Sequence, residues 1–328
     1  MRRAAIRGLG SYAPERVLTN FELEQTLDTS DEWITTRTGI RERHLAAPEE
    51  SSSTMGAAAA RRALADGGLS PEDIDLVICA TNTPDTPFPS TAARIGAALG
   101  MPARPAFDVQ AGCTGLIYGL ELATAGIEAG HWRHVLLVGT DTLSRIVDWT
   151  DRSTAVLFGD GAGAFVLSAS ESGRGVLGSY LNCDGRGGDL LCLPAGGSKL
   201  PASAETVADR QHYMKMNGNE VFKFAVRAVP EAVEQVLGRA GVEAHEIDLW
   251  VPHQANRRII DAGLAPFRLD EARVVVNVDR YGNTSVASIP LALDEARRAG
   301  RLLDDGLVLL VAFGAGLAWG AAVIRWGA

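Results

Sequence analysis

The sequence predicts an α/β protein built from two similar halves. Apolar runs with the length of strands alternate with runs whose apolar residues recur at helical spacing, an order typical of α/β folds with largely parallel sheets. The chain has 36 glycines in 328 residues, which fits many tight turns between strands and helices. Segments of the first half also recur in order in the second, which indicates a duplication.

Length and composition narrow the possible functions. A chain of 328 residues forms one large domain or two of ordinary size. Its net charge of −9 argues against a nucleic-acid-binding protein, and no apolar run approaches the ~18 residues that span a bilayer. Arg7 and Gly8 interrupt the basic start before a signal-peptide core forms. We therefore expect a cytoplasmic protein that binds neither nucleic acid nor membrane.

The elements of the first half follow from periodicity and from helix start and stop signals. A short helix begins after Ser30, a favourable N-cap, and ends at Gly39, a favourable stop. The sequence then predicts helices over 54–66, 91–99 and 116–129, and strands over 74–80, 105–109, 135–139 and 163–168.

Four pairs of segments carry the duplication, at an offset of about 170 residues. They are 9–12 with 177–180, 68–76 with 241–249, 107–109 with 276–278, and 129–138 with 299–311. The boundary falls near Ser172 and Gly173, so we expect one half at residues 1–173 and the other at 174–328. A polar, glycine-rich stretch from Asp184 to Arg210 has no counterpart in the first half and is predicted to be an inserted loop.

Cys113 lies in a glycine-flanked turn between the strand ending at Val109 and the helix beginning at Leu116. The unpaired N–H groups and the dipole at a helix's first turn favour a thiolate there. Taken alone, Cys113 better fits a buried structural cysteine, because free cysteine is among the most buried residue types. The other cysteines form no CxxC pair, zinc spacing or disulfide framework; they are Cys79, Cys183 and Cys192.

Two polar residues of the second half occupy positions that match those around Cys113. Under the duplication, Asn283 corresponds to Cys113 within one residue, and His253 follows a strand equivalent to 74–80. Ligand clefts of open α/β sheets form just past the carboxyl ends of strands, where all three residues lie. Singly, His253 fits a hydrogen-bonded core histidine and Asn283 a turn residue. Together the three predict a shared site.

Seven motifs spread along the chain point to one known family. They are TSDEWI at 29–34 with RTGI at 37–40, AGCTG at 111–115, FGDGAGA at 158–164, GNEVF at 218–222, HQAN at 253–256, GNTS at 282–285 and AFGAG at 312–316. With them the chain resembles, nearly end to end, the β-ketoacyl-[acyl-carrier-protein] synthase III family, the condensing enzymes that start type II fatty acid synthesis. The resemblance implies the thiolase fold, in which duplicated halves form a five-layered α-β-α-β-α sandwich, and a homodimer.

The chain differs from three related families at the positions of their catalytic or glycine-loop residues, which favours the resembled family over them. Thiolases carry a second cysteine near the C-terminal glycine loop, where this chain has Gly314, Ala315 and Gly316. Elongating synthases pair the cysteine with two histidines, whereas the third residue here is Asn283. Chalcone-synthase relatives have a proline where this chain has Ala315, which also replaces a glycine found in many members of the resembled family.

The resemblance implies a role for each candidate catalytic residue. Cys113 takes the acyl group from acyl-CoA, and the backbone N–H groups of Cys113 and Ala315 form the oxyanion hole. His253 and Asn283 then stabilise the enolate formed when malonyl-[acyl-carrier protein] loses CO₂. No metal and no separate cofactor are implied, because the CoA thioester is a substrate.

The resemblance also implies a CoA site and an acyl pocket. Trp33 stacks on the adenine of CoA, with Arg37 and Arg152 near the adenine or the phosphates, and Asn256 contacts the pantetheine arm. From spacing alone, Trp33 and Arg37 better fit an ordinary surface pair on one helix face. Phe88 lines the acyl pocket and can reach it across the dimer.

Acyl carrier protein is acidic, so its docking on this negatively charged chain requires a local basic patch. Lys223, Arg257 and Arg258 are the candidates. The segment from Asp261 to Arg268 is less basic than is usual in the family.

Two other functions remain open at this stage. One is a relative from a secondary-metabolite pathway, either a priming ketosynthase or an enzyme that moves the acyl group to an oxygen, nitrogen or sulfur nucleophile. The other is a non-catalytic acyl-binding protein on the same fold. Because acyl-transferring relatives often lose the asparagine or alter the histidine, the presence of both His253 and Asn283 favours decarboxylative condensation.

Overall fold

Two sheets form the centre of the computed structural model, which describes residues 2–327. The first sheet has the order β1-β7-β6-β4-β5 and the second β11-β12-β13-β8. The strands of the first are β1 (Arg3–Tyr12), β4 (Leu76–Ala80), β5 (Ala106–Val109), β6 (His134–Asp141) and β7 (Gly161–Ser170). Those of the second are β8 (Gly175–Cys183), β11 (Leu249–Pro252), β12 (Leu307–Gly314) and β13 (Ala318–Arg325). The chain therefore passes from one sheet to the other between Ser170 and Gly175.

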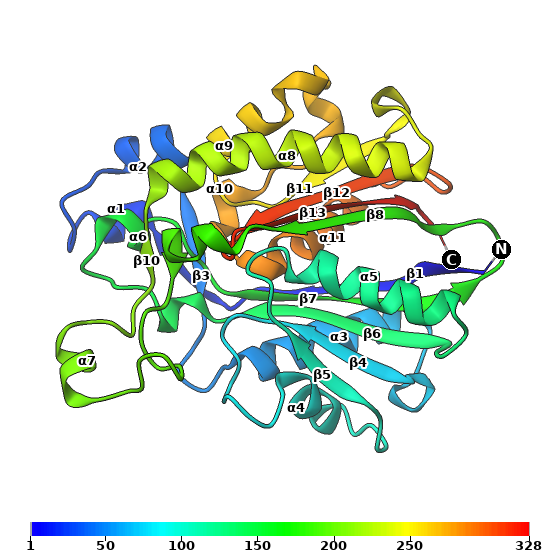
Figure 1. Cartoon of the computed structure of the whole chain (residues 1–328), viewed down its shortest axis with the longest axis horizontal. Helices are drawn as coiled ribbons and strands as arrows, with labels where there is room; N and C mark the ends of the chain where they lie inside the picture. The colour runs from blue at the N-terminus through cyan, green and yellow to red at the C-terminus, as the bar shows by residue number, and fades with distance from the viewer. Residues whose placement is uncertain (1, 328) are drawn as a thin grey trace.

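The main helices lie in three layers around these sheets (Figure 1). Helices α5 (Gly115–Glu128) and α11 (Ser288–Arg298) pack between the two sheets. The outer face of the first sheet is covered by α3 (Ser52–Gly67) and α4 (Thr91–Ala98), and that of the second by α8 (Gly218–Ala240) and α9 (Arg257–Leu264). The expected five-layered α-β-α-β-α sandwich is thus confirmed.

The remaining elements are short and lie outside these layers. They are α1 (Asn20–Leu23), α2 (Asp31–Thr38), α6 (Arg152–Ala155), α7 (Ala204–Ala208), α10 (Val278–Tyr281) and the strand pairs β2 (Arg16–Thr19) with β3 (Glu42–Leu45) and β9 (Leu191–Cys192) with β10 (Lys215–Met216). The predicted ends of α2 are confirmed, because Ser30 Oγ accepts from the N–H of Trp33 and Gly39 has a φ of 79°.

The central helices join the two sheets through one apolar core. Helix α5 is apolar around most of its surface, and Leu116, Ile117 and Leu120 are buried with Leu137 of β6 and Leu310 of β12. A helix with so wide an apolar surface is stable only where other elements cover that surface. The turns at the start of α5 and just before α11 therefore come close together between the sheets, and these turns carry Cys113 and Asn283.

The expectation of largely parallel sheets is wrong, because both sheets are mixed. Strands β5, β4 and β6 run parallel, as do β11 and β12, but β1, β7, β13 and β8 pair antiparallel with their neighbours. The connection from β12 to β13 consists only of residues 315–317, and so short a connection permits only an antiparallel pair.

The duplication is less regular at one sheet edge than the sequence suggested. Residues 107–109 lie in β5, but residues 276–278 form no named strand. The second half has only an isolated bridge between Trp250 and Val274 at this edge, followed by α10 at Val278. The segment from Asp184 to Arg210, predicted as an inserted loop, contains β9 and the short helix α7, which Figure 1 shows well away from the layers.

None of the helices that residues 2–327 form combines the length and the apolar character needed to cross a bilayer.

Candidate active site

The loop that carries Cys113 lies directly against the end of β12 from the other half. Gly112 has a φ of +55°, and a Cβ there would lie 2.7 Å from the backbone nitrogen of Ala315. A Cβ on Gly314 would lie 3.0 Å from the Cβ of Cys113. Both glycines thus permit a backbone approach that no larger residue allows. The thiol of the first half consequently sits beside the glycine loop of the second.

Two backbone donors are available at this contact. Within residues 2–327, neither the N–H of Cys113 nor that of Ala315 donates to another residue, although the N–H of Cys113 interacts with its own sulfur. Both residues are only partly buried, and their N–H groups lie on adjoining loops without a partner in another residue. They can receive an oxygen that becomes negatively charged, which is the role expected for them.

Ser285 connects Cys113 with Asn283. Its Oγ lies 3.4 Å from Sγ of Cys113, and its backbone N–H donates to Oδ1 of Asn283 at 2.9 Å. Because Oδ1 is occupied, the amide Nδ2 of Asn283 is the group left to donate to a ligand. Asn283 is only 7% exposed, so this donor lies in a largely water-free place.

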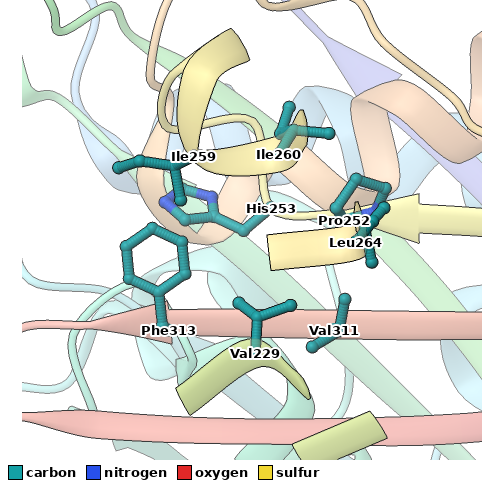
Figure 2. A pocket seen from close by; sticks show the side chains of 8 residues that line it. All are labelled: Val229, Pro252, His253, Ile259, Ile260, Leu264, Val311 and Phe313. Carbon is teal, nitrogen blue, oxygen red and sulfur yellow. The ribbon is translucent and has the colours of Figure 1, made fainter. Parts of the chain in front are cut away.

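His253 follows β11, and only one nitrogen of its ring is hydrogen-bonded within the described residues. Its Nδ1 lies 2.6 Å from Oγ of Ser288, in the first turn of α11, whereas Nε2 has no partner among the described residues. The ring of Phe313 packs edge-on against the imidazole, with the ring centroids 5.5 Å apart (Figure 2). Phe313 precedes Gly314 on β12, so neighbouring residues of one strand contact His253 and Cys113.

The surroundings of His253 are otherwise apolar. A cavity of about 10 Å³ adjoins the ring, and the other residues that line it are apolar (Figure 2). They are Val229, Pro252, Ile259, Ile260, Leu264, Val311 and Phe313. A buried water needs two to four polar partners, which this cavity does not offer. Burial lowers the pKa of His253 to about 3, so the imidazole is neutral at physiological pH.

The expected preference of Cys113 for the thiolate is not met in the unliganded site. Burial raises the pKa of the Cys113 thiol to about 12, and the hydrogen bond from Ser285 opposes this rise. Thr114 is the N-cap of α5, so Cys113 lies one residue before the N-cap and outside the first turn of the helix. The helix-terminus argument left out the cost of burying a charge, which is the largest influence on this thiol.

The predicted CoA residues gather at α2. The guanidinium of Arg152 lies over the Trp33 ring at 4.7 Å from its centroid, and that of Arg37 at 6.0 Å. Asn256 is the N-cap of α9: its Oδ1 accepts from the N–H of Arg258, and its Nδ2 donates to the carbonyl of Arg37. One cluster therefore joins the nucleotide candidates to α9.

The predicted carrier-docking residues lie on α8 and α9. Lys223 pairs with Glu220 at 2.8 Å and Arg257 with Asp261 at 2.7 Å, whereas Arg258 lies over the ring of Phe222 at 5.6 Å. Phe88, the predicted acyl-pocket residue, is elsewhere: it is 85% exposed and is not among the residues that line the cavity beside His253.

Sequence reasoning missed the two serines that touch the candidate catalytic side chains. Ser285 is the last residue of the GNTS motif, and Ser288 follows three residues later. A serine at the start of a helix most often caps it, so neither position signalled contact with a reacting group. Residues 2–327 contain no cluster of three or more His, Cys, Asp or Glu side chains placed to hold a metal ion.

Comparison with known proteins identifies the family. Residues 107–185 match the family described as 3-oxoacyl-[acyl-carrier-protein] synthase III, and residues 237–326 match its C-terminal part. The β-ketoacyl-[acyl-carrier-protein] synthase III of Symbiobacterium thermophilum is 56% identical over 327 residues, which cover 100% of this chain and 99% of the relative. The corresponding protein of Caldanaerobacter subterraneus subsp. tengcongensis is 53% identical over 323 residues, 98% of each chain.

Solved structures give the same result. The crystal structure of 3-oxoacyl-[acyl-carrier-protein] synthase III from Aquifex aeolicus VF5 matches with a TM-score of 0.92 and 46% identity, covering 98% of this chain and 100% of the other. A priming β-ketosynthase from the R1128 polyketide biosynthetic pathway matches with a TM-score of 0.90 and 37% identity, covering 98% and 96%. The chain belongs to the β-ketoacyl-[acyl-carrier-protein] synthase III family, acyltransferases whose condensation initiates fatty acid synthesis.

Proposed function

We propose that this chain performs the condensation in two half-reactions at the site of Cys113, His253 and Asn283, as a cytoplasmic homodimer. The first half-reaction takes an acyl group from acyl-CoA, and the second joins it to malonyl-[acyl-carrier protein]. The chain is 53–56% identical to the β-ketoacyl-[acyl-carrier-protein] synthases III but 37% identical to the polyketide priming enzyme. This difference supports a role in fatty acid synthesis over one in a secondary-metabolite pathway.

In the first half-reaction the sulfur of Cys113 attacks the thioester carbonyl of acyl-CoA. The carbonyl oxygen becomes an oxyanion, which the free N–H groups of Cys113 and Ala315 stabilise. When the intermediate collapses, the bond to the CoA sulfur breaks and an acyl-Cys113 thioester remains. The thiol proton ends on the departing CoA, which leaves as a free thiol.

In the second half-reaction two neutral donors hold the thioester oxygen of malonyl-[acyl-carrier protein]. Nε2 of His253 and Nδ2 of Asn283 have no partner among the described residues, and each can carry a proton for donation. Loss of CO₂ leaves an enolate on that oxygen, and its carbon attacks the acyl group on Cys113. The bond to Sγ breaks, and one proton taken up from solvent restores the thiol.

Neutral donors suit this step for an electrostatic reason. The enolate must be stabilised without being protonated on carbon, and a neutral imidazole is a far weaker acid than an imidazolium. The low pKa of His253, about 3, keeps the ring in the required form across the physiological range.

We propose that Trp33 and Arg152 hold the adenine of CoA, with Arg37 near its phosphates and Asn256 near its pantetheine arm. The guanidinium over the Trp33 ring already forms a flat cationic stack, which supports this assignment. Arg258, with Lys223 and Arg257 beside it, forms the basic patch for the acidic carrier. Of the three, Arg258 is the one without a carboxylate partner among residues 2–327.

Phe88 is proposed to complete the acyl pocket of a second copy of the chain. An 85% exposed phenylalanine is unusual for a large apolar side chain unless another molecule covers it. This assignment supports the homodimer that the family resemblance implies.

The observation that carries the catalytic proposal is the buried thiol beside two unpaired backbone N–H groups and two unpaired side-chain donors. Intact-protein mass spectrometry after incubation with a panel of acyl-CoAs tests the first step. We expect an acyl adduct in the wild type and in Cys192→Ser, and none in Cys113→Ala. His253→Ala should still acylate but release little CO₂ from malonyl-[acyl-carrier protein]. Normal condensation by His253→Ala, or an acyl adduct on Cys113→Ala, would contradict the proposal.

A further inference from the structure

A buried carboxylate anchors a polar network that ends at the nucleophile. Asp141, the last residue of β6, is fully buried and accepts five hydrogen bonds from Thr81, Asn82 and Thr83. These three residues follow directly after β4, at the same edge of the sheet as Cys113. Because all five groups are donors, Asp141 fixes the orientation of the segment as an acceptor only.

The direction of the next hydrogen bonds follows from donor counting. The Nδ2 of Asn82 has two protons: one goes to Oδ2 of Asp141 at 2.9 Å, and the other to Oγ of Ser285 at 3.1 Å. The Ser285 oxygen therefore accepts from Asn82 and turns its own proton away. That proton faces Sγ of Cys113, 3.4 Å from Oγ. From the Asn82 amide the donations therefore run in two directions, one to the carboxylate of Asp141 and the other through Ser285 to the sulfur of Cys113.

The backbone of Ser285 is held in an uncommon conformation. Its φ is +51°, in the region where residues other than glycine are rare. The N–H bond to Oδ1 of Asn283 and the bond from Asn82 together hold the residue there. Such conformations persist where surrounding contacts determine them, and they concentrate at functional sites.

We propose that Ser285 is a positioning residue for the nucleophile: its hydroxyl, oriented by Asn82 and Asp141, donates a hydrogen bond that stabilises the thiolate form of Cys113. Hydrogen bonds to a charged acceptor are stronger than those to a neutral one, so the bond strengthens as the sulfur becomes negative. This happens twice in the reaction, when the sulfur attacks acyl-CoA and when it leaves the acyl group during condensation. The inference builds on the proposed nucleophilic role of Cys113.

Burial and a nearby charge oppose the effect of Ser285 on the pKa of Cys113. Burial and the carboxylate of Asp141 both raise the pKa of the thiol, and the Ser285 hydroxyl lowers it. His253 is neutral and adds no charge. Removing the hydroxyl takes away the larger of the two influences that favour the thiolate and leaves the backbone N–H of Cys113 as the other, so the apparent pKa of Cys113 should rise.

The test is the pH dependence of Cys113 alkylation by iodoacetamide, followed by mass spectrometry in the full-length protein without substrates. Ser285→Gly removes the hydroxyl and accepts the positive φ, so it separates hydrogen bonding from backbone strain. We expect the apparent pKa to rise by about one unit, which is about a tenfold slower reaction at a fixed pH below the pKa. Asn82→Ala should give a shift of the same sign, and adding it to Ser285→Gly should change little.

The matched control is Thr284→Val, which removes a neighbouring buried hydroxyl that has no hydrogen-bond partner. It should leave the alkylation profile unchanged. An unshifted profile in Ser285→Gly, or an equal shift in Thr284→Val, would overturn the proposal. The test needs no turnover, so a failed condensation assay in the wild type would contradict the proposed function without affecting this result.

Discussion

The Oγ of Ser288 lies 2.6 Å from Nδ1 of His253, and it is the only polar group within residues 2–327 that hydrogen-bonds the ring. When Nδ1 accepts from a hydroxyl, the ring proton resides on Nε2, which is the tautomer that can donate to a thioester oxygen. We expect Ser288 at the start of α11 to act as this donor and so to favour the tautomer with its proton on Nε2.

Replacing Ser288 with alanine should impair condensation more than acylation. Without the hydroxyl the other tautomer becomes accessible, and the lost hydrogen bond corresponds to about a two- to tenfold slower decarboxylation. Single-turnover CO₂ release from malonyl-[acyl-carrier protein], measured beside acylation of Cys113, separates the two steps. Ser288→Thr keeps the hydroxyl and serves as the control. Equal loss in both half-reactions of Ser288→Ala would show that the serine acts structurally.

The low pKa of His253 predicts acid sensitivity of the fold. The ring titrates near 6.5 in the unfolded chain but at about 3 in the folded one. Below pH 6.5 the unfolded state binds the extra proton, so the free energy of unfolding falls as the pH drops from 6.5 towards 3. One such proton amounts to about 1.4 kcal/mol per pH unit. Urea unfolding at pH 7 and pH 5 measures this loss.

His253→Gln lacks the titrating group and is the comparison for that measurement. Its stability should decrease less between pH 7 and pH 5 than that of the wild type. If both proteins lose the same stability over this interval, the folded-state pKa of His253 lies near its ordinary value and the neutral-donor argument fails.

Gly314→Ala should disrupt the contact between the two halves at the nucleophile. Its Cβ would fall on the backbone nitrogen of Cys113, which cannot move without displacing the loop. We expect a loss of about 1–3 kcal/mol in stability and more than a tenfold loss of acylation. Gly238→Ala in α8 is the matched control, because nothing lies within 4 Å of its Cβ. That change should stabilise the helix by about 0.5–1 kcal/mol. Normal acylation by Gly314→Ala would contradict the close approach.

Arg258→Glu should weaken use of the carrier substrate selectively. Arg258 has no carboxylate partner among the described residues, so its charge is available to an acidic protein. The KM for malonyl-[acyl-carrier protein] should rise about tenfold and lose its salt dependence, while acylation by acyl-CoA stays the same. Lys223→Glu should have a smaller effect because Glu220 already pairs with that lysine. Arg61→Glu on α3, at the opposite outer layer, is the control. An unchanged KM in Arg258→Glu would remove α9 from the docking surface.

The sequence predicted much of the fold because its signals were local. Ser30 and Gly39 marked the ends of α2, and apolar runs identified β4, β5, β6, β7 and β11. Strand direction was missed, since no periodicity encodes it, although the short stretch from Gly314 to Ala318 required an antiparallel pair. The missing edge strand near Val276 was not visible either, because a single bridge and a strand have similar apolar patterns.

The parts of the site that could be predicted were those that carry reactive side chains or follow the ends of strands. Cys113 and His253 are residue types that often take part in catalysis, and the duplication related Asn283 to Cys113. Asn82 lies just past the end of β4 and Asp141 is the last residue of β6, so the same signal was present for them. The bonds from Asn82 to Asp141 and to Ser285 join three segments that meet only in the folded chain. The pKa of Cys113 likewise depends on burial, which a helix-start pattern does not reveal.

The last two residues of β12 contact different parts of the site. Phe313 packs against the imidazole of His253, and Gly314 packs against the loop that carries Cys113. Successive strand residues face opposite ways, so a shift of one position would exchange the two. The phenyl ring would then point at the Cys113 loop, where there is room only for the hydrogen atom of a glycine. His253 would lose its contact with the aromatic ring. Insertions or deletions of a single residue in β12 should therefore be far more harmful to activity than any conservative substitution along its length.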